Sequence, residues 1–236
     1  TLGLLLNNGT GKLGNAVLLA TGADRPHGVA VGDLDEDGDV DLVSANYGFP
    51  STLSLLFGNG AGAFAPAVVV QMGPAAVWAG DQVQIADIDE DGHVDLVSNL
   101  SVRLGDGNGG FATLLPPLSQ WSKTVLVDFD QDGHLDLVEP SHDLTLRFGD
   151  GQGGVQSSAS YDAGASAKAA AVADLDLGGD LDVAVLDMGL GGVGDVKPML
   201  NDGSSSFPPL AAQLDLTGIL SAQFATVADV DDDGAL

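Results

Sequence analysis

An aspartate-rich pattern repeats along the chain at the spacing that calcium ligands need. In its first copy, Asp33, Asp35 and Asp37 alternate with other residues, Gly38 follows, and Asp41 completes the pattern Asp-x-Asp-x-Asp-Gly-x-x-Asp. Ca²⁺ takes about six to eight oxygen ligands, and alternate residues of a tight loop can supply them. Side chains at positions 1, 3, 5 and 9 and the backbone carbonyl at position 7 would form the shell, while glycine at position 6 permits the reversal. The pattern therefore predicts a calcium-binding loop.

The same pattern starts again at Asp87, Asp128, Asp174 and Asp229. The fourth copy has Gly178 in place of the position-5 carboxylate, so we expect weaker or absent metal there, and the fifth stops before its closing ligand. Position 7 uses only its carbonyl, so we expect the imidazoles of His93 and His134 to face water. The predicted metal residues are Asp33, Asp35, Asp37, Asp39 and Asp41; Asp87, Asp89, Asp91, His93 and Asp95; Asp128, Asp130, Asp132, His134 and Asp136; Asp174, Asp176, Asp180 and Asp182; and Asp229, Asp231 and Asp233.

An EF-hand is the rival metal-binding interpretation, because Asp128 to Glu139 also satisfies the spacing of that loop. EF-hand loops lie between helices, whereas Val125–Val127 precedes this loop and Pro140 follows it at once. Position 12 varies among the copies, while position 9 is always aspartate in the complete ones. The β interpretation is therefore preferred.

The acidic composition supports folded metal loops and argues against two classes of partner. The formal net charge is -27, yet the mean hydropathy of +0.21 is too high for an acidic disordered chain. Nucleic acid and anionic membrane surfaces both require a basic footprint, which this chain lacks. No apolar run approaches the roughly 20 residues of a membrane span, so we expect no membrane insertion in this segment.

Short apolar runs on both sides of each loop predict the strands that hold it. One strand leads into the loop, one leaves it, a third ends in a glycine turn such as Gly58-Asn59-Gly60, and a fourth follows. Four antiparallel strands per unit without a helical period predict an all-β chain made of β-propeller blades, with calcium loops between the first and second strands. The predicted fourth strands begin near Phe64, Phe111, Val155 and Phe207.

The chain is out of phase with these units. It opens with a third strand and its turn, Leu4 to Gly9, and closes inside the fifth loop, which gives four full repeats and a half repeat at each end. We expect residues 1–236 to be a single propeller domain, or part of a longer propeller.

With the loops and strands placed, the segment Phe57-Gly-Asn-Gly-Ala-Gly-Ala-Phe-Ala-Pro66 completes a resemblance. The chain resembles the FG-GAP/VCBS repeats of integrin α-chain propellers, of bacterial surface proteins and of a group of propeller lectins. The resemblance implies an extracellular propeller of about six to eight blades with Ca²⁺ between the first two strands of each. The family includes adhesins, lectins and lyase domains, so the resemblance leaves the ligand open.

A ligand is expected on the face opposite the calcium loops, where the second-to-third-strand and inter-blade connections lie. Tyr47, Phe49, Trp78 and Trp121 fall on that face, near Arg25 and His27. Such aromatic rings can stack on a sugar or anchor a protein; alternatively, the tryptophans pack between blades as core. We expect an extracellular binding or adhesion module that takes a protein or glycan. A calcium-dependent lectin is the alternative, and a domain of a polysaccharide-processing enzyme is a second one. We expect no enzyme activity, because the chain has no cysteine and its four lysines are scattered.

Overall fold

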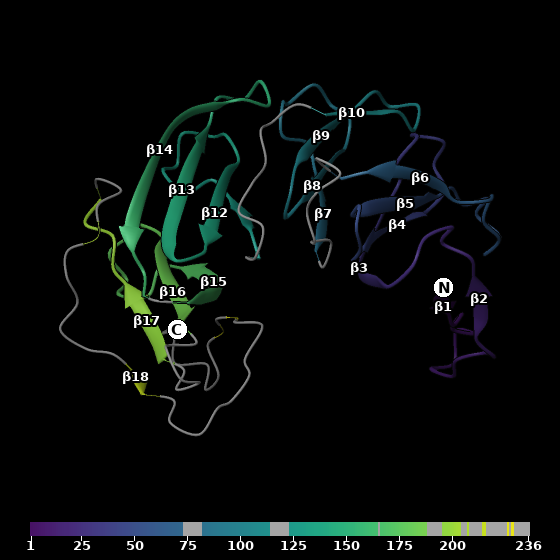
Figure 1. Ribbon diagram of the computed structural model, residues 1–236, viewed down its shortest axis with the longest axis horizontal. Coiled ribbons are helices and arrows are strands. Elements are labelled where there is room, and N and C mark those ends of the chain that lie inside the picture. The colour runs from purple at the N-terminus through teal and green to yellow at the C-terminus, as the bar shows by residue number, and fades with distance from the viewer. Residues whose placement is uncertain are drawn as a thin grey trace. The chain divides into compact units, whose positions relative to one another are not determined.

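The computed structural model of the protein consists of β-strands and the loops that join them (Figure 1). The structure describes residues 1–72, 82–113, 123–164, 166–187 and 195–203, with 207, 214–215, 226 and 228. Within these ranges all regular elements are strands, and no helix there is long and apolar enough to cross a membrane. By its internal contacts the chain divides into two compact units, Thr1–Gln120 and Trp121–Leu236.

The first unit holds a short hairpin and two four-stranded antiparallel sheets, blades 1 and 2, whose strands follow one another in chain order. The hairpin pairs β1 (Leu2–Leu4) with β2 (Val17–Leu19). Blade 1 contains β3 (Pro26–Gly32), β4 (Asp41–Asn46), β5 (Thr52–Leu56) and β6 (Val68–Gln71). Blade 2 contains β7 (Val83–Ala86), β8 (Asp95–Ser98), β9 (Val102–Gly105) and β10 (Phe111–Thr113).

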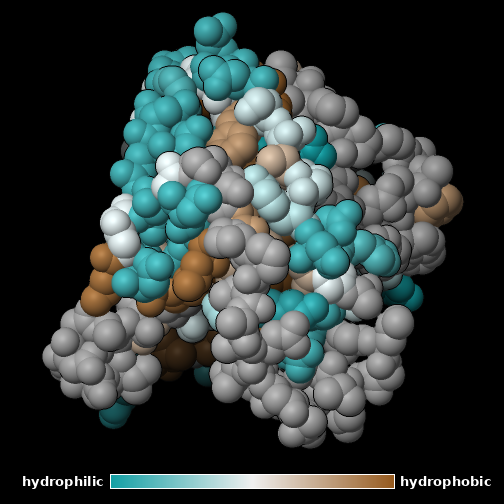
Figure 2. All heavy atoms as spheres, turned by 90° about the vertical axis from the view of Figure 1, so that its left-hand side faces the viewer, coloured by the Kyte–Doolittle hydropathy of each residue, from teal (hydrophilic) through white to brown (hydrophobic). Residues whose placement is uncertain are grey.

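The second unit repeats this construction in blades 3 and 4. Blade 3 contains β11 (Val125–Val127), β12 (Asp136–Pro140), β13 (Asp143–Gly149) and β14 (Val155–Asp162). Blade 4 contains β15 (Ala167–Ala173), β16 (Asp182–Asp187), β17 (Asp195–Met199) and β18 (Leu214–Asp215). The outer strand β14 exposes Gln156, Ser157, Ser158 and Ser160, and Figure 2, which looks at the side where β14 lies, shows hydrophilic residues gathered at its upper left with apolar residues below them. Polar side chains on an outer strand discourage pairing with another chain.

The predicted fold class is confirmed: the sheets are β-propeller blades, each a four-stranded antiparallel meander. The fourth strand starts later than predicted in two blades. Phe64 forms only an isolated bridge with Gly58, because the backbone of the preceding turn is bonded to Asn59, and β6 begins at Val68. Phe207 lies before β18 and packs edge-on against Tyr161, with ring centroids 4.8 Å apart.

Each unit has a core between its two blades. In the first unit, buried side chains of β4 and β5 meet those of β7 and β8; Val43, Leu53, Val83 and Leu96 are among them. In the second unit, Val138 and Leu146 of blade 3 meet Val183 and Val185 of blade 4. Burying each such side chain contributes about 1.5–3 kcal/mol, so face-to-face packing of neighbouring blades is what stabilises a unit. The second strand of each blade is covered on both faces, which fixes the position of the acidic loop that precedes it.

Candidate metal sites

Each of the first four acidic loops joins the first strand of a blade to its second. The position-9 aspartates Asp41, Asp95, Asp136 and Asp182 are the first residues of β4, β8, β12 and β16, and each is at most 1% exposed. Their carboxylates fasten the loop at two points, because one oxygen accepts the backbone N–H at position 2 and the other accepts the N–H of the turn after the third strand.

These eight hydrogen bonds are nearly the same in all four blades. The Oδ2 atoms accept from Leu34, Ile88, Phe129 and Leu175 at 2.8, 2.7, 2.7 and 2.7 Å. The Oδ1 atoms accept from Gly58, Gly105, Gly149 and Asn201 at 2.6, 2.8, 2.8 and 2.7 Å. The position-9 carboxylate is therefore a structural fastener as well as a candidate ligand.

The position-1 aspartates leave one oxygen ready for a cation. In every loop the Oδ2 atom accepts the N–H of the residue at position 6, at 3.0 Å for Asp33, 3.1 Å for Asp87, 3.0 Å for Asp128 and 3.0 Å for Asp174. The Oδ1 atom of each of these four residues is buried and has no hydrogen-bond partner. The Oδ1 atoms of Asp35 and Asp89, at position 3, are in the same state. A buried carboxylate oxygen without a donor is costly unless a cation satisfies it.

The carboxylates of each loop converge to within ligand distance of a common point. Four groups have oxygens that all lie within 4.8 Å of one another: Asp33, Asp35 and Asp37; Asp87, Asp89 and Asp95; Asp128, Asp130 and Asp136; and Asp174, Asp176 and Asp182. An all-oxygen set of carboxylates in a flexible loop suits a hard divalent cation such as Ca²⁺. The residues present therefore fit the predicted metal.

Backbone strain at position 4 accompanies this convergence. Glu36, Glu90, Gln131 and Leu177 have φ values of 58°, 57°, 61° and 61°, in the left-handed region that residues other than glycine seldom adopt. Such a conformation costs roughly 1–2 kcal/mol at a non-glycine residue. The same strained residue in four loops indicates that the surrounding hydrogen bonds impose the conformation.

The fourth loop keeps the fold of the others without its position-5 carboxylate. In loops 1 to 3 the position-5 aspartate accepts the N–H of position 7, at 2.8 Å for Asp37 and Asp91 and 2.9 Å for Asp132. In the fourth loop Gly178 has no side chain to accept this N–H. Asp176 at position 3 accepts the N–H of Gly178 at 2.8 Å, as the position-3 aspartates of loops 1 to 3 accept the N–H at position 5. The fourth loop therefore lacks one carboxylate, and weaker metal binding there remains our prediction.

Burial and repulsion between carboxylates raise the pKa of several aspartates in the loops. Burial, and next the charge of a neighbouring aspartate, raise the pKa of Asp35, Asp89 and Asp130 at position 3. Burial also raises the pKa of Asp95 and Asp136 at position 9, against the lowering effect of their backbone hydrogen bonds. The ionised carboxylates thus disfavour the fold without a cation, and a cation would reverse that sign.

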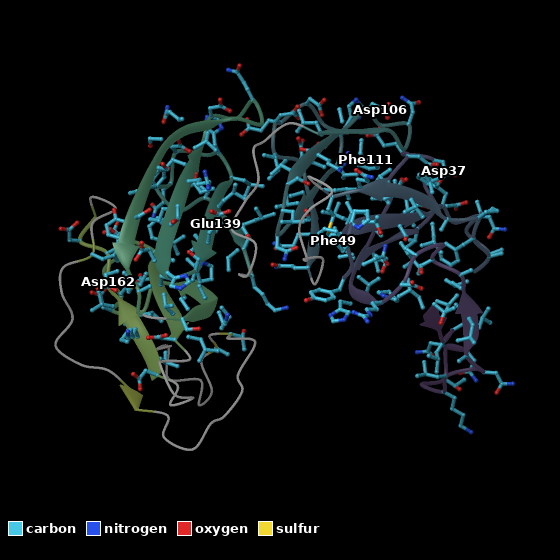
Figure 3. All side chains as sticks on the ribbon, viewed as in Figure 1. Asp37, Phe49, Asp106, Phe111, Glu139 and Asp162 are labelled. Carbon is cyan, nitrogen blue, oxygen red and sulfur yellow. The ribbon has the colours of Figure 1, made fainter. Side chains whose placement is uncertain are left out.

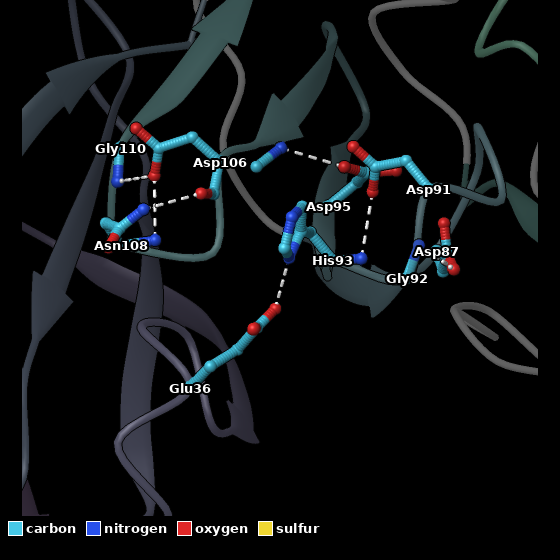
Figure 4. Close-up of polar contacts among 10 residues, drawn as sticks. Glu36, Asp87, Asp91, Gly92, His93, Asp95, Asp106, Asn108 and Gly110 are labelled. Carbon is cyan, nitrogen blue, oxygen red and sulfur yellow. Dashed lines mark hydrogen bonds and ion pairs between the residues drawn. The ribbon is translucent and has the colours of Figure 1, made fainter.

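Neighbouring loops within a unit touch one another. The Nδ1 atom of His93 lies 2.5 Å from Oε1 of Glu36, so the second loop contacts the first (Figure 4). The His93 side chain is 37% exposed, and it also makes the contact with Glu36, which the sequence did not predict; that hydrogen bond raises the pKa of His93. In the second unit, Nε2 of Gln131 donates to the carbonyl of Gly179 at 3.0 Å, which joins the third and fourth loops.

The glycine turns after the third strands pack directly against the metal loops. A Cβ on Gly58, Gly105 or Gly149 would overlap the backbone carbonyl of Val40, Val94 or Leu135, respectively. The same face receives the side chains at position 7, since Gly60 lies against Asp39 and Gly203 lies against Asp180. Asp106 closes its own turn by accepting the N–H groups of Asn108 and Gly110, each at 2.9 Å (Figure 4). Two of the predicted residues, Asp39 and Asp180, therefore contact a turn with their side chains.

The remaining predicted residues have different outcomes. Trp78, Trp121, Asp229, Asp231 and Asp233 lie outside the described residues. Tyr47 and Phe49 lie between β4 and β5, at the end of blade 1 away from Asp37 (Figure 3), and together they line a pocket of about 430 Å³.

Three features of the site were missed by sequence reasoning. The apolar residue at position 2 enters the core, where Leu34 and Phe129 are each 1% exposed; its apolar character in every copy was a readable signal. The left-handed position 4 and the Glu36–His93 contact had no signal, because both depend on the folded backbone and on the packing of adjacent blades.

Comparison with known proteins identifies the repeat. Residues 34–98 match the model of the FG-GAP-like repeat, a segment that runs from the first acidic loop to the end of β8. No curated protein matches the chain. The match spans one repeat period, and the blades around it carry the same acidic loop at the same place. This segment of the chain is therefore similar to an FG-GAP-like repeat, as the resemblance in the sequence implied.

Proposed function

We propose that the protein is an extracellular, calcium-stabilised binding module in which the acidic loops hold the blades together and the opposite face takes the ligand. The observation that carries the metal assignment is the buried Oδ1 atom without a partner at position 1 of all four described loops. Converging carboxylates and a formal charge of -27 support it, because four Ca²⁺ ions would bring +8 and leave -19.

The proposal makes calcium a structural ion. The loop carboxylates lie at the start of buried strands and are bonded to the backbone, so an ion bound there is joined to the sheet and is remote from the β4–β5 connection. Extracellular modules of this kind bind Ca²⁺ with dissociation constants of roughly 10⁻⁴ to 10⁻³ M, which suits millimolar extracellular calcium.

A binding role is preferred over catalysis because two of the basic side chains that a polysaccharide lyase could use are engaged within the blades. Nζ of Lys197 lies 2.9 Å from Oδ2 of Asp187, and Nε of Arg147 lies 2.9 Å from Oε2 of the buried Glu139. Both pairs link neighbouring strands inside a blade, so they serve the scaffold.

The test is calcium binding measured together with thermal stability. At about 5 mM Ca²⁺ each site of the stated affinity would add about 1–2 kcal/mol, so two sites in one unit would raise its Tm by roughly 8–16 °C. Isothermal titration should show binding of Ca²⁺ and much weaker binding of Mg²⁺, which prefers rigid octahedral sites and keeps its water. An unchanged Tm on adding calcium to metal-free protein would refute the structural role of the ion.

A further inference from the structure

The connection between the second and third strands is longest in blade 1 among the first three blades. β4 ends at Asn46 and β5 begins at Thr52, which leaves the five residues 47–51. The equivalent connections are the three residues 99–101 in blade 2 and the two residues 141–142 in blade 3. The extra residues include Tyr47, Phe49 and Pro50, so the local insertion is aromatic in a chain with only 5% aromatic residues. Loops placed on a rigid scaffold are where binding residues concentrate.

This insertion builds a pocket with the segment that leads into β3. The pocket has a volume of about 430 Å³, within the range of roughly 300–1,000 Å³ for small-molecule sites. Asp24 and Arg25 line it from the leading segment, Tyr47 and Phe49 from the insertion, and Val69 from β6. It lies at the end of β4 opposite to the acidic loop, because β4 runs from Asp41 to Asn46.

The pocket wall is held in place before any ligand arrives. The N–H of Tyr47 donates to the carbonyl of Arg25 at 2.9 Å, which joins the two segments. The ring of Tyr47 stacks on His27, with centroids 5.3 Å apart and planes at 24°. Arg25 has a φ of 49°, a left-handed conformation that arginine rarely adopts. Strain of this kind persists where the surroundings impose it, and it often marks a binding site. Preorganisation of this kind reduces the cost of binding.

The two charged groups of the pocket are one acceptor and one donor. Asp24 and Arg25 are both exposed, and within the described part of the chain neither takes part in an ion pair. An ionised carboxylate only accepts hydrogen bonds and a guanidinium only donates them, whereas a hydroxyl does both. Adjacent hydroxyls of a sugar can therefore bond to this pair. Asn46 is not available in the same way, because its Nδ2 donates to Thr52 and Ser54 at 3.1 and 2.8 Å.

The apolar groups suit the ring of a sugar. Phe49 is 55% exposed although it lines the pocket, so a large part of its surface can still be covered. Aromatic rings offer a flat apolar face against which the C–H groups of a pyranose can pack. An acidic ligand is disfavoured, because Asp24 stands beside Arg25 and the whole chain repels anions.

We propose that this pocket of blade 1 binds a neutral sugar residue, with Asp24 and Arg25 bonded to its hydroxyls and Phe49 and Tyr47 against its C–H face. The proposal rests on the proposed function insofar as it takes the face opposite the acidic loops as the binding face.

The experiment titrates the protein in calcium with the methyl glycosides of glucose, galactose, mannose, fucose and N-acetylglucosamine, followed by saturation-transfer NMR and calorimetry. Methyl glucuronide and an Asp/Glu-rich peptide are the acidic probes. At least one neutral glycoside should bind. Phe49→Ala should weaken that binding about tenfold or more, and Arg25→Gln should weaken it severalfold, as for side chains at the centre of a site. The matched controls Leu18→Ala and Lys12→Gln, which are exposed residues outside the pocket, should leave it unchanged.

Three results would overturn the assignment. They are no binding of any neutral glycoside, binding that survives both pocket substitutions, and binding of the acidic probes alone. Melting curves of the same variants, with and without calcium, show that each is folded. They also separate the two proposals: a calcium-dependent Tm without sugar binding removes the pocket assignment and leaves the metal role intact. If sugar binding is lost in Phe49→Ala but the Tm of the protein does not change with calcium, the pocket assignment stands and the structural role of calcium is removed.

Discussion

Replacing Asp136 with alanine should destabilise the second unit even when no calcium is present. Its carboxylate is 1% exposed, and it accepts backbone N–H groups of Phe129 at 2.7 Å and Gly149 at 2.8 Å. Alanine leaves both donors buried without an acceptor, at about 1–3 kcal/mol each. Part of this loss is offset, because burial raises the pKa of Asp136 and the ionised form therefore opposes folding at neutral pH. We expect a net loss of about 2–4 kcal/mol.

Urea denaturation followed by far-UV circular dichroism, in metal-free buffer at neutral pH, measures this loss. The midpoint should fall while the slope stays the same, because the surface exposed on unfolding is unchanged. Asp128→Asn is the matched control from the same loop. Asparagine can still accept from the N–H of Gly133, as Asp128 does at 3.0 Å, and it removes one charge from a repelling cluster.

The two variants should therefore separate fastening from metal binding. Without calcium, Asp128→Asn should change the unfolding free energy by less than about 0.5 kcal/mol, yet it should lose most of the stabilisation that calcium gives. A cost below about 1 kcal/mol for Asp136→Ala in metal-free buffer would refute the fastening role of position 9. A full calcium gain in Asp128→Asn would refute the position-1 oxygen as a ligand.

Three further predictions concern backbone strain, close packing and pH. Leu177→Asn should stabilise the second unit by about 0.5–1 kcal/mol in urea denaturation, because asparagine tolerates the φ of 61° better than an exposed leucine, whereas Leu177→Ala should not; equal effects would contradict strain at this position. Gly105→Ala should lower the unfolding free energy of the first unit by about 1–3 kcal/mol, because its Cβ would overlap the carbonyl of Val94, and a neutral result would mean that the turn can move aside. Calcium-free protein should melt at a higher temperature at pH 5 than at pH 7.5. His93 and the carboxyl groups at positions 3 and 9 have raised pKa values, so they contribute stability when protonated, and that stability is lost as pH rises through their folded-state pKa values; a metal-free Tm that is equal or higher at pH 7.5 would oppose this sign. Asp106 and Asp150 have lowered pKa values, so the stability that they contribute is lost as pH falls below the ordinary range of an aspartate. They therefore do not change the stability between pH 5 and pH 7.5.

The blades and their acidic loops could be predicted because both leave local patterns. Alternating apolar residues fix the strands, and a carboxylate at every second position fixes the loop, so the four groups of converging oxygens follow from spacing alone. The start of β6 was misplaced at Phe64 because an aromatic residue after a glycine turn has the composition of a strand, although its backbone bonds stay within the turn.

Other features depend on residues far apart in sequence. The bond from the Asp136 carboxylate to Gly149 requires the register of β12 against β13, which no single segment encodes. Glu36 and His93 are 57 residues apart and meet only because blades 1 and 2 pack face to face. The pocket at Tyr47 joins two connections whose proximity depends on the pairing of β3 with β4.

The contacts between neighbouring loops have a consequence for the proposed metal binding. An ion that immobilised the first loop would also restrain Glu36, and through Glu36 it would restrain His93 of the second loop. Part of the conformational entropy that a second ion must remove would then be lost already, so we expect the second ion to bind more tightly than it would alone. Gln131 and Gly179 link the third and fourth loops in the same way. Filling should therefore be cooperative within each unit, and the degenerate fourth loop should take its ion after its neighbour has done so.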